Sequence, residues 1–358
     1  MADNGVLKGC IFVGANASGK STIILGIKLL LDLLFSERNL NSGMFRCIFG
    51  ERRQYSLEYE FLIENKTIKY FFEFDTERDM ITEKLHLDDK LMLERMGLSA
   101  KAYIAEPTGV NYDDSDVGKD TLFLRTLYFN TKFPSNPVLS AWIDYLKKSV
   151  YINLFDKKII TYGAAEVSAL RYLDNGGCEA INNFFNEYNF EQNIEYEHSS
   201  QGGGVDIVVG NDESEKDVFF KRKGVDIPIP FGEESLGNKN LIRILPAFLT
   251  VIKNDGMLLI DEFSSGFHND LESLWVKYFI EKANHAQMIF VSHSTNLLSN
   301  SILRPDQEYV VEFRNEDGSS VKRFSSEQPR SAQNIEKMYV SGVFGGLPDY
   351  KEVNDETE

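Results

Sequence analysis

The chain has 358 residues, a formal net charge of −17 and 42% hydrophobic residues. This length suffices for one large α/β domain with an insert, or for two domains. The negative charge disfavours nucleic acid as a general partner, so DNA binding would need a local basic patch. No run of about 18 uncharged apolar residues exists, so we expect no membrane-spanning segment.

Four short basic clusters are candidates for such a patch: Arg52-Arg53, Lys147-Lys148, Lys157-Lys158 and Lys221-Arg222-Lys223. None has enough interleaved aromatic residues to be typical of a nucleic-acid reader. A solvated surface is the simpler interpretation of each cluster.

The cysteines and the start of the chain bear on location. Cys10, Cys47 and Cys178 form no C-x-x-C pair, which suits a reducing compartment and argues against zinc. We interpret them as small buried hydrophobes. The first five residues lack the basic start of a signal peptide. A cytoplasmic location is therefore expected.

The first predicted elements are a strand, a glycine-rich loop and a helix. Residues 7–13 form an apolar run typical of a buried strand, and residues 22–34 have the pattern of a helix. The loop between them, GANASGKST, matches G-x-x-x-x-G-K-S/T, the phosphate-binding P-loop. Gly14 and Gly19 allow the backbone to curl so that its N–H groups point at phosphate oxygens.

This loop predicts a nucleoside triphosphate site. The helix N-terminus adds partial positive charge, Lys20 would reach the β- and γ-phosphates, and Ser21 would ligate Mg²⁺. The predicted nucleotide-binding residues here are Gly14, Asn16, Ala17, Ser18, Gly19, Lys20, Ser21 and Thr22.

An antiparallel meander is predicted next, because strand-like pieces at 56–61, 68–74 and 81–87 are separated by turn-forming residues. From about Gly97 to Glu197 the spacing becomes helical, most clearly at 122–128, 138–146 and 178–188. We interpret this stretch as a helical insert. Strands are then expected at 193–197, 205–209, 218–221 and 227–230.

A serine and a glycine, Ser235 and Gly237, open the next predicted helix, which runs to about Ile252. Such a helix start forms a small anion-binding nest. Serine is also a common N-cap, so this pattern alone keeps both interpretations.

Two carboxylates, Asp261 and Glu262, end the apolar strand predicted at 257–260. An acid pair at the end of a buried strand is costly unless it serves a metal or a reaction. Asp261 would hold Mg²⁺ and Glu262 would act as general base on the attacking water. A salt-bridged strand end is the alternative.

A further strand at 288–291 is followed by Ser292 and His293. A histidine at this place would contact the γ-phosphate and sense hydrolysis. The alternative is a structural histidine, as for the other four in the chain.

In this order, the motifs resemble the ABC-type ATPase head, a group that includes SMC, RecF and OLD-family ATPases. GANASGKS, ESLGNKNLIRILPAF, LLIDEFSSGFH and FVSHSTNLL are most similar to the bacterial AAA-family, OLD-related ATPases of phage-defence and abortive-infection systems. Residues 334–339 and 342–348 share this similarity, which covers nearly the whole chain.

The resemblance implies an α/β P-loop NTPase of the ABC ATPase-head type, a mixed sheet with an antiparallel β meander and a helical insert. The expected division is an ATPase lobe at 1–96, the insert at 97–200, a second ATPase lobe at 201–346 and an acidic tail at 347–358.

The resemblance also implies ATP hydrolysis in a homodimer, or in a higher oligomer built on head-to-tail dimers, with ATP and Mg²⁺ as cofactors. Residues Lys20, Ser21, Asp261, Glu262 and His293 of one protomer would face Ser235 and Gly237 of the other. Residues 264–266 take the place of the D-loop, and Gln54 is the nearest candidate for a Q-loop glutamine.

OLD proteins also carry a C-terminal Toprim nuclease, for which residues 294–358 are too few. We therefore expect a nucleotide-gated sensor and scaffold that controls a separately encoded effector, a nuclease or toxin, in anti-phage defence, with the insert as docking surface. One alternative is a DNA-binding RecF- or SMC-like ATPase in DNA repair or maintenance. Another is a module that holds ATP to stabilise a complex.

Overall fold

A computed structural model describes residues 5–36, 54–104, 112–131, 133, 135–163, 167–198, 216–314 and 318–347. Arg52-Arg53, Cys47, the strand predicted at 205–209 and nearly all of the acidic tail lie outside these residues. Within them, no helix is long and apolar enough to cross a membrane.

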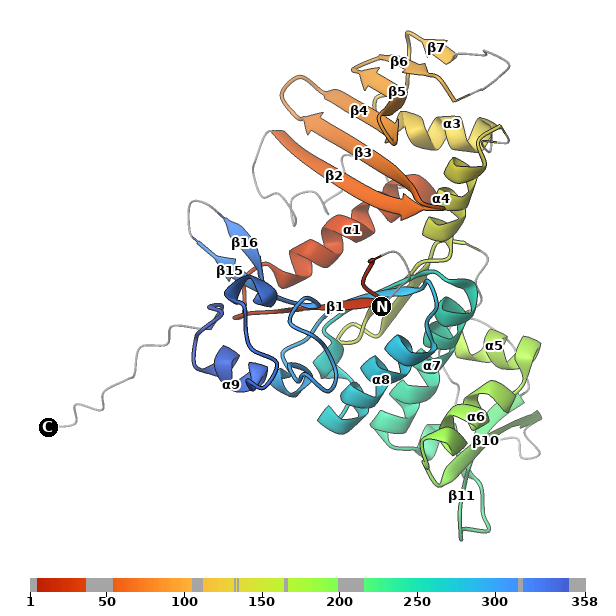
Figure 1. The fold of residues 1–358 in the computed structure, drawn as a ribbon. Helices are drawn as coiled ribbons and strands as arrows, with labels where there is room; N and C mark the ends of the chain where they lie inside the picture. Colours follow the sequence, from red (N-terminus) through yellow and green to blue (C-terminus); the bar gives the residue numbers. More distant parts are fainter. Residues whose placement is uncertain are drawn as a thin grey trace, which may run out of the picture.

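A seven-stranded sheet forms the centre of the molecule, in the order β16-β15-β1-β14-β13-β8-β9 (Figure 1). The five inner strands run parallel, and β9 and β16 pair antiparallel at the two edges. The strands are β1 (Gly9–Val13), β8 (Val150–Asn153), β9 (Lys158–Thr161), β13 (Met257–Asp261), β14 (Gln287–Val291), β15 (Glu308–Phe313) and β16 (Ser319–Arg323).

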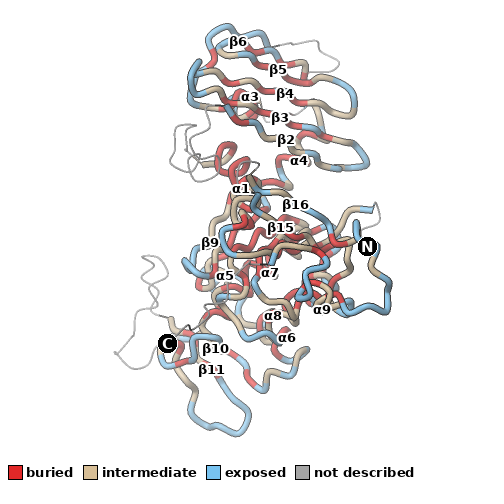
Figure 2. The backbone as a smooth tube through the Cα atoms, turned by 90° about the vertical axis from the view of Figure 1, so that its left-hand side faces the viewer, coloured by how far each residue is buried: buried red, intermediate tan, exposed pale blue. Residues whose placement is uncertain are grey.

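The inner strands are mostly apolar because both faces of the sheet are covered. In β13, Leu258 and Ile260 enter one hydrophobic core, whereas Met257 and Leu259 enter the other. This alternation follows from the two-residue period of a strand. Buried residues accordingly concentrate along the sheet and the helices packed on it (Figure 2).

Helices cover the two faces of the sheet in two groups (Figure 1). The core on one face includes side chains from α5 (Ala169–Gly176), α6 (Glu179–Glu187), α7 (Leu236–Asn254), α8 (Asn269–Lys282) and α9 (Ile335–Val340). The core on the other face includes side chains from α1 (Lys20–Phe35), α3 (Phe123–Thr131) and α4 (Pro137–Lys147). Short 3₁₀ turns are η1 (Phe231–Glu233), η2 (Phe263–Ser265), η3 (Thr295–Leu297) and η5 (Phe324–Glu327).

The predicted antiparallel meander is confirmed and has six strands in sequential order. They are β2 (Gln54–Ile63), β3 (Lys66–Asp75), β4 (Met80–Leu87), β5 (Lys90–Met96), β6 (Ser99–Ala102) and β7 (Tyr112–Asp114). A separate three-stranded antiparallel sheet contains β10 (Gln192–His198), β11 (Lys216–Arg222) and β12 (Ile229–Pro230). The α/β class, with a mixed sheet and a meander, is therefore confirmed.

The prediction of a helical insert across 97–200 is wrong in part. Four helices do lie in this stretch, but β6 and β7 extend the meander, and β8 and β9 belong to the central sheet. β8 has only four residues and is separated from α4 by two residues. In the sequence, its apolar residues therefore look like a continuation of the apolar pattern of the helix. A strand this short gives no period of its own. The division into domains remains a prediction.

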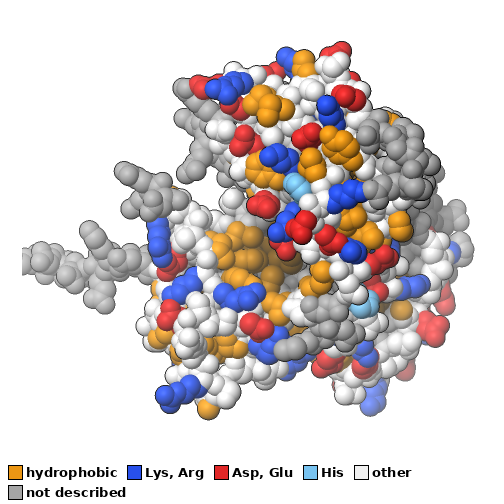
Figure 3. Space-filling view, turned by 45° about the horizontal axis from the view of Figure 1, so that its top comes forward, with side chains coloured by type: hydrophobic (Ala, Val, Ile, Leu, Met, Phe, Trp, Pro, Cys, Tyr) orange, Lys and Arg blue, Asp and Glu red, His pale blue; other side chains and the backbone are white. Residues whose placement is uncertain are grey.

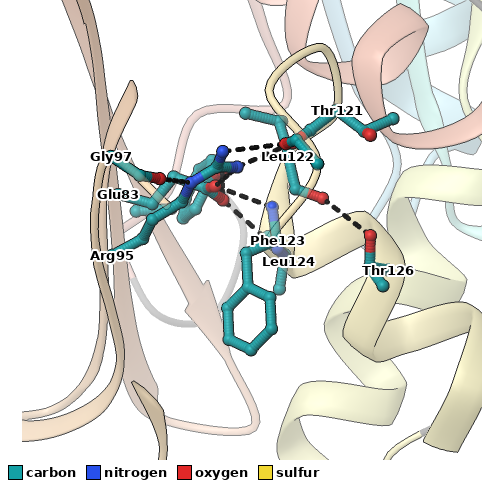
Figure 4. Close-up of polar contacts among 10 residues, drawn as sticks. Glu83, Arg95, Gly97, Thr121, Leu122, Phe123, Leu124 and Thr126 are labelled. Carbon is teal, nitrogen blue, oxygen red and sulfur yellow. Dashed lines mark hydrogen bonds and ion pairs between the residues drawn. The ribbon is translucent and has the colours of Figure 1, made fainter. Parts of the chain in front are cut away.

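A buried ion pair attaches the meander to α3 (Figure 4). The carboxylate of Glu83, on β4, accepts hydrogen bonds from the backbone N–H groups of Phe123 and Leu124, at 2.7 and 3.2 Å. Arg95 Nη1, on β5, lies 3.1 Å from Glu83 Oε1, and both side chains are at most 1% exposed. Glu83 thus caps α3 from a distant strand, because a carboxylate is favourable at a helix N-terminus.

The Arg95 guanidinium makes three further hydrogen bonds. It donates to the carbonyl oxygens of Gly97, Gly118 and Thr121, at 2.7 to 2.9 Å. A second tie runs from Arg125 on α3 to the Leu34 carbonyl at the end of α1. Through these contacts the meander is attached, by way of α3, to α1, the helix that follows the P-loop.

Arg95→Met should lower the free energy of unfolding by about 3 kcal/mol or more, because the substitution leaves a buried carboxylate without its charge partner. Urea denaturation measures this change. Lys66→Met is the matched control, since Lys66 pairs with Asp88 at 2.7 Å on the exposed side of the same sheet. That control should change stability little. Equal effects of the two substitutions would contradict the proposed anchor.

Candidate functional site

Most of the candidate residues meet where the parallel strands of the central sheet end. β1, β13 and β14 are parallel, so the segments that follow them leave the sheet at the same edge. β1 leads into the P-loop, β13 ends in Asp261 and β14 leads to His293. Ligands of open α/β sheets bind at this edge.

The P-loop adopts backbone conformations that require its glycines. Gly14 and Gly19 have φ angles of 151° and 100°. A methyl group at Gly14 would lie 2.3 Å from the carbonyl oxygen of Val311, and one at Gly19 would lie 2.3 Å from Ser319 Oγ. Asn16 and Ala17 form the exposed tip of the loop, and Ala17 also has a positive φ angle, 62°.

Lys20 lies inside the loop and is only 5% exposed. Its ammonium group donates to the carbonyl oxygens of Gly14 and Ala15, at 3.0 and 2.7 Å. Burial lowers the pKa of Lys20, and the nearby Glu262 and Asp261 oppose this shift. The cation is thus held at the centre of the loop by groups that a phosphate can replace.

Ser18 supplies evidence that the loop is shaped for a ligand. Its hydroxyl group is buried and has no hydrogen-bond partner among the residues that the structure describes. A buried unpaired hydroxyl is costly, and a phosphate oxygen in the loop would satisfy it. Thr22, at the start of α1, is half-buried next to Ser21.

The predicted metal-binding pair is in contact. Ser21 Oγ donates to Asp261 Oδ1 at 2.9 Å, although the residues are 240 positions apart. Burial raises the pKa of Asp261, and the Ser21 hydrogen bond opposes that rise. Two oxygen ligands fit Mg²⁺, which usually takes one or two carboxylates and completes its shell with water and phosphate. Within the described residues there is no cluster of three or more His, Cys, Asp or Glu side chains that could hold a metal.

Glu262 and His293 lie side by side next to this pair. His293 Nε2 is 3.8 Å from Glu262 Oε2, and both side chains are roughly one-third exposed, at 39% and 31%. Glu262 has a left-handed backbone, with φ 57° and ψ 44°. A non-glycine residue in this region is strained, and such strain is concentrated at functional sites.

The loop after Glu262 joins the two motifs. The Ser265 hydroxyl donates to Glu262 Oε2 at 3.4 Å. The Ser264 hydroxyl accepts from the His293 backbone N–H at 3.2 Å. The segment predicted as the D-loop therefore fixes the relative positions of the acid and the histidine.

Ser235 and Gly237 lie apart from these residues. Ser235 is the N-cap of α7, and its hydroxyl accepts from the Asn238 N–H at 3.3 Å. A methyl group at Gly237 would meet nothing within 4 Å, so the protomer itself leaves space there. In the part of the chain that the structure describes, no hydrogen bond joins Ser235 or Gly237 to the P-loop.

Asn153 is a candidate that sequence reasoning missed. It ends β8 and pairs in register with Asp261 on the neighbouring strand. Its amide therefore stands at the same edge of the sheet as the metal-binding pair. Gln54, the Q-loop candidate, is exposed at the start of β2 in the meander. No sequence signal marked Asn153, because its position follows only from the pairing of β8 with β13.

The face of the molecule in Figure 3 is mixed in charge. Lysine and arginine side chains lie among aspartate and glutamate there (Figure 3). Lys221 pairs with Glu195, and Arg222 pairs with Glu234.

Burial raises the pKa of the Cys10 thiol to about 12, which suits an unreactive cysteine.

These observations show a loop of P-loop sequence, with Lys20 and Ser21, at the carboxyl ends of the central strands. Residues 11–299 match the family described as "AAA domain, putative AbiEii toxin, Type IV TA system". The match spans most of the chain, and the chain belongs to this AAA family. No curated protein matches the sequence.

Among solved structures, the chain is similar to the SMC head domain from Thermotoga maritima, with 13% identity, a TM-score of 0.47 and coverage of 88% of this chain and 90% of that one. It is also similar to an SmcHead bound to the C-winged helix domain of ScpA, with 14% identity, a TM-score of 0.47 and the same coverage. Likeness at this level adds nothing to the functional assignment.

Lys20→Ala should abolish nucleotide binding, because the substitution removes the cation at the centre of the loop. Binding of a fluorescent ATP analogue measures the loss. The fold should persist, since Lys20 bonds only to carbonyl oxygens of its own loop. Lys8→Ala, which removes a lysine bound to the Ile280 carbonyl, is the control. Unchanged affinity of the Lys20 variant would overturn the assignment of the loop.

Proposed function

We propose that this protein binds and hydrolyses ATP with Mg²⁺, and that it acts as a nucleotide-gated sensor and scaffold for a separately encoded effector. One observation carries the catalytic part. The Ser21 hydroxyl donates a hydrogen bond to Asp261, at the end of β13. The loop before Ser21 holds the buried Lys20 and a Ser18 hydroxyl that has no partner among the described residues, and both suit a phosphate ligand. Family membership supports the same reading.

The residues divide the work of phosphoryl transfer. The loop N–H groups, Ser18 and Lys20 hold the phosphates, and Ser21 and Asp261 hold Mg²⁺. Bound Mg²⁺ would supply positive charge at the phosphoryl oxygens. Glu262 orients the attacking water and takes its proton, and His293 contacts the γ-phosphate beside it.

The separation of Ser235 and Gly237 from the P-loop supports a dimer. A helix N-terminus with a hydroxyl and an open glycine is suited to an anion. Among the described residues, no hydrogen bond joins this nest to the P-loop of its own protomer. In a head-to-tail dimer it would face the γ-phosphate held by the partner, so that ATP stabilises the closed form and hydrolysis releases it.

The biological setting is proposed on two grounds. The family description joins an AAA domain to a toxin of a type IV toxin–antitoxin system. The sequence motifs resemble ATPases of phage-defence and abortive-infection systems. Both support a setting in toxin–antitoxin or defence systems, and within that setting we propose a switch in which a second protein, a nuclease or toxin, performs the destructive step. Bacterial anti-phage defence is therefore the proposed role.

Glu262→Gln should bind ATP with normal affinity, turn it over at least about a hundredfold more slowly, and accumulate as an ATP-bound dimer. Phosphate release measures the rate, and sedimentation measures the dimer. The amide keeps the size of the side chain but cannot take a proton. Hydrolysis at the wild-type rate would show that another group is the base.

The scaffold role predicts a partner whose association depends on nucleotide. Affinity purification from the native host, with wild type and Glu262→Gln in parallel, should recover a nuclease or toxin-like protein in stoichiometric amount from only one of the two. Lys20→Ala, which lacks the nucleotide-bound state, is the control. Recovery of DNA or DNA-repair proteins alone would contradict this role and favour a RecF-like function.

A further inference from the structure

A buried carboxylate lies directly beneath the anion-binding nest of α7. Glu234 precedes Ser235, and its side chain is 1% exposed. Its Oε2 atom accepts from the Ser235 backbone N–H at 2.9 Å and from Asn238 Nδ2 at 2.7 Å. The carboxylate thus fixes the first turn of the helix by holding residues on both sides of the nest.

This arrangement creates an electrostatic conflict. The positive end of α7 attracts a phosphate, whereas an ionised carboxylate beside it repels one. The repulsion would be strong because Glu234 is shielded from solvent. The nest can accept an anion only if the carboxylate is neutralised by a nearby cation.

Arg222, the last residue of β11, supplies that cation. Its guanidinium group donates to Glu234 Oε1, the oxygen that the helix does not use. Arg222 also lies opposite Gln192 in the β10–β11 pair, and the Gln192 amide bonds to Asn238 at 3.2 Å. One end of the β10–β11 pair therefore meets the first turn of α7 at two points.

The other cations of this region are used elsewhere. Lys239 Nζ donates to the Gly232 carbonyl at 2.6 Å, and the Arg243 guanidinium lies over the Phe231 ring at 5.7 Å. Among the described residues, Arg222 is the cation in contact with Glu234.

We propose that the Arg222–Glu234 pair sets the charge of the nest. The Glu234 carboxylate holds Ser235 and Asn238 in place, and the positive charge of Arg222 offsets the negative charge of that carboxylate. Arg222 is then a positioning residue that allows the nest to receive a phosphate held by a second protomer. This inference rests on the proposed ATP-driven dimer and assigns its control to the C-terminal end of β11, where Arg222 lies.

The test uses Glu262→Gln as the parent, so that ATP persists. Arg222→Met removes the cation and keeps most of the stem. It should raise the dissociation constant of the ATP-bound dimer at least about tenfold, because the remaining carboxylate is uncompensated. Adding Glu234→Gln to Arg222→Met removes the charge and keeps an acceptor for Ser235 and Asn238. The double variant should recover to within about threefold of the parent.

Lys221→Met is the matched control, since it removes a positive charge from the adjacent position of β11, where Lys221 pairs with Glu195. It should dimerise like the parent. Sedimentation with ATP measures dimerisation, and titration of dilute protein with an ATP analogue measures affinity of the single protomer. That affinity should be the same in all four proteins.

Two results would overturn the inference and leave the proposed function intact. Arg222→Met could dimerise like the parent, which would show that the charge is irrelevant. The double variant could be as defective as Arg222→Met, which would show that Arg222 only holds the structure together. If the Glu262→Gln parent binds ATP but does not dimerise, the proposed ATP-driven dimer fails, and the inference fails with it.

Discussion

The candidate site depends on parallel strand pairing in the central sheet. β1, β13 and β14 leave the sheet at one edge, and the Ser21–Asp261 hydrogen bond of 2.9 Å is the direct result. These residues are 240 positions apart, so no local preference of the chain brings them together. The apolar inner strands, buried on both faces, hold the alignment.

This alignment brings the charged side chains of Lys20 and Asp261 to a position where they are partly shielded from water. Burial lowers the pKa of Lys20 and raises that of Asp261, so each environment disfavours the charged form. For Lys20, the nearby Glu262 and Asp261 partly offset this effect. For Asp261, the Ser21 hydrogen bond partly offsets it, whereas the negative charge of Glu262 adds to it. A phosphate and a divalent cation would offset it further, because each adds the charge that its neighbours lack. The cost of assembling the site is therefore recovered when ligand binds, as expected of a preorganised polar site.

The sequence was sufficient for the features that local chemistry determines. The P-loop was predictable because its backbone needs glycine at positions 14 and 19. The acid pair of Asp261 and Glu262 was predictable because carboxylates rarely end a buried strand unless they bind a metal or take part in a reaction. Asn153 was not predictable, since its place beside Asp261 depends on the pairing of the four-residue strand β8. The Glu83 cap of α3 was hidden for the same reason, because the capping carboxylate lies on β4, 40 positions before Phe123. Wherever a contact depended on register between distant segments, periodicity carried no information about it.

The nest and the catalytic edge of one protomer are joined by a continuous set of contacts. Asn240, on the first turns of α7, donates to the Gly266 carbonyl at 3.3 Å, and Ser264 in the same loop accepts from the His293 N–H. In the proposed dimer, a phosphate on the nest would order the start of α7 and so bias the loop that carries Ser264. Because the nest of one protomer serves the nucleotide of the other, this arrangement would make the state of each site depend on its partner. Coupling of this kind needs a two-state element, and the loop between Glu262 and Gly266, strained at its first residue, is suited to that role.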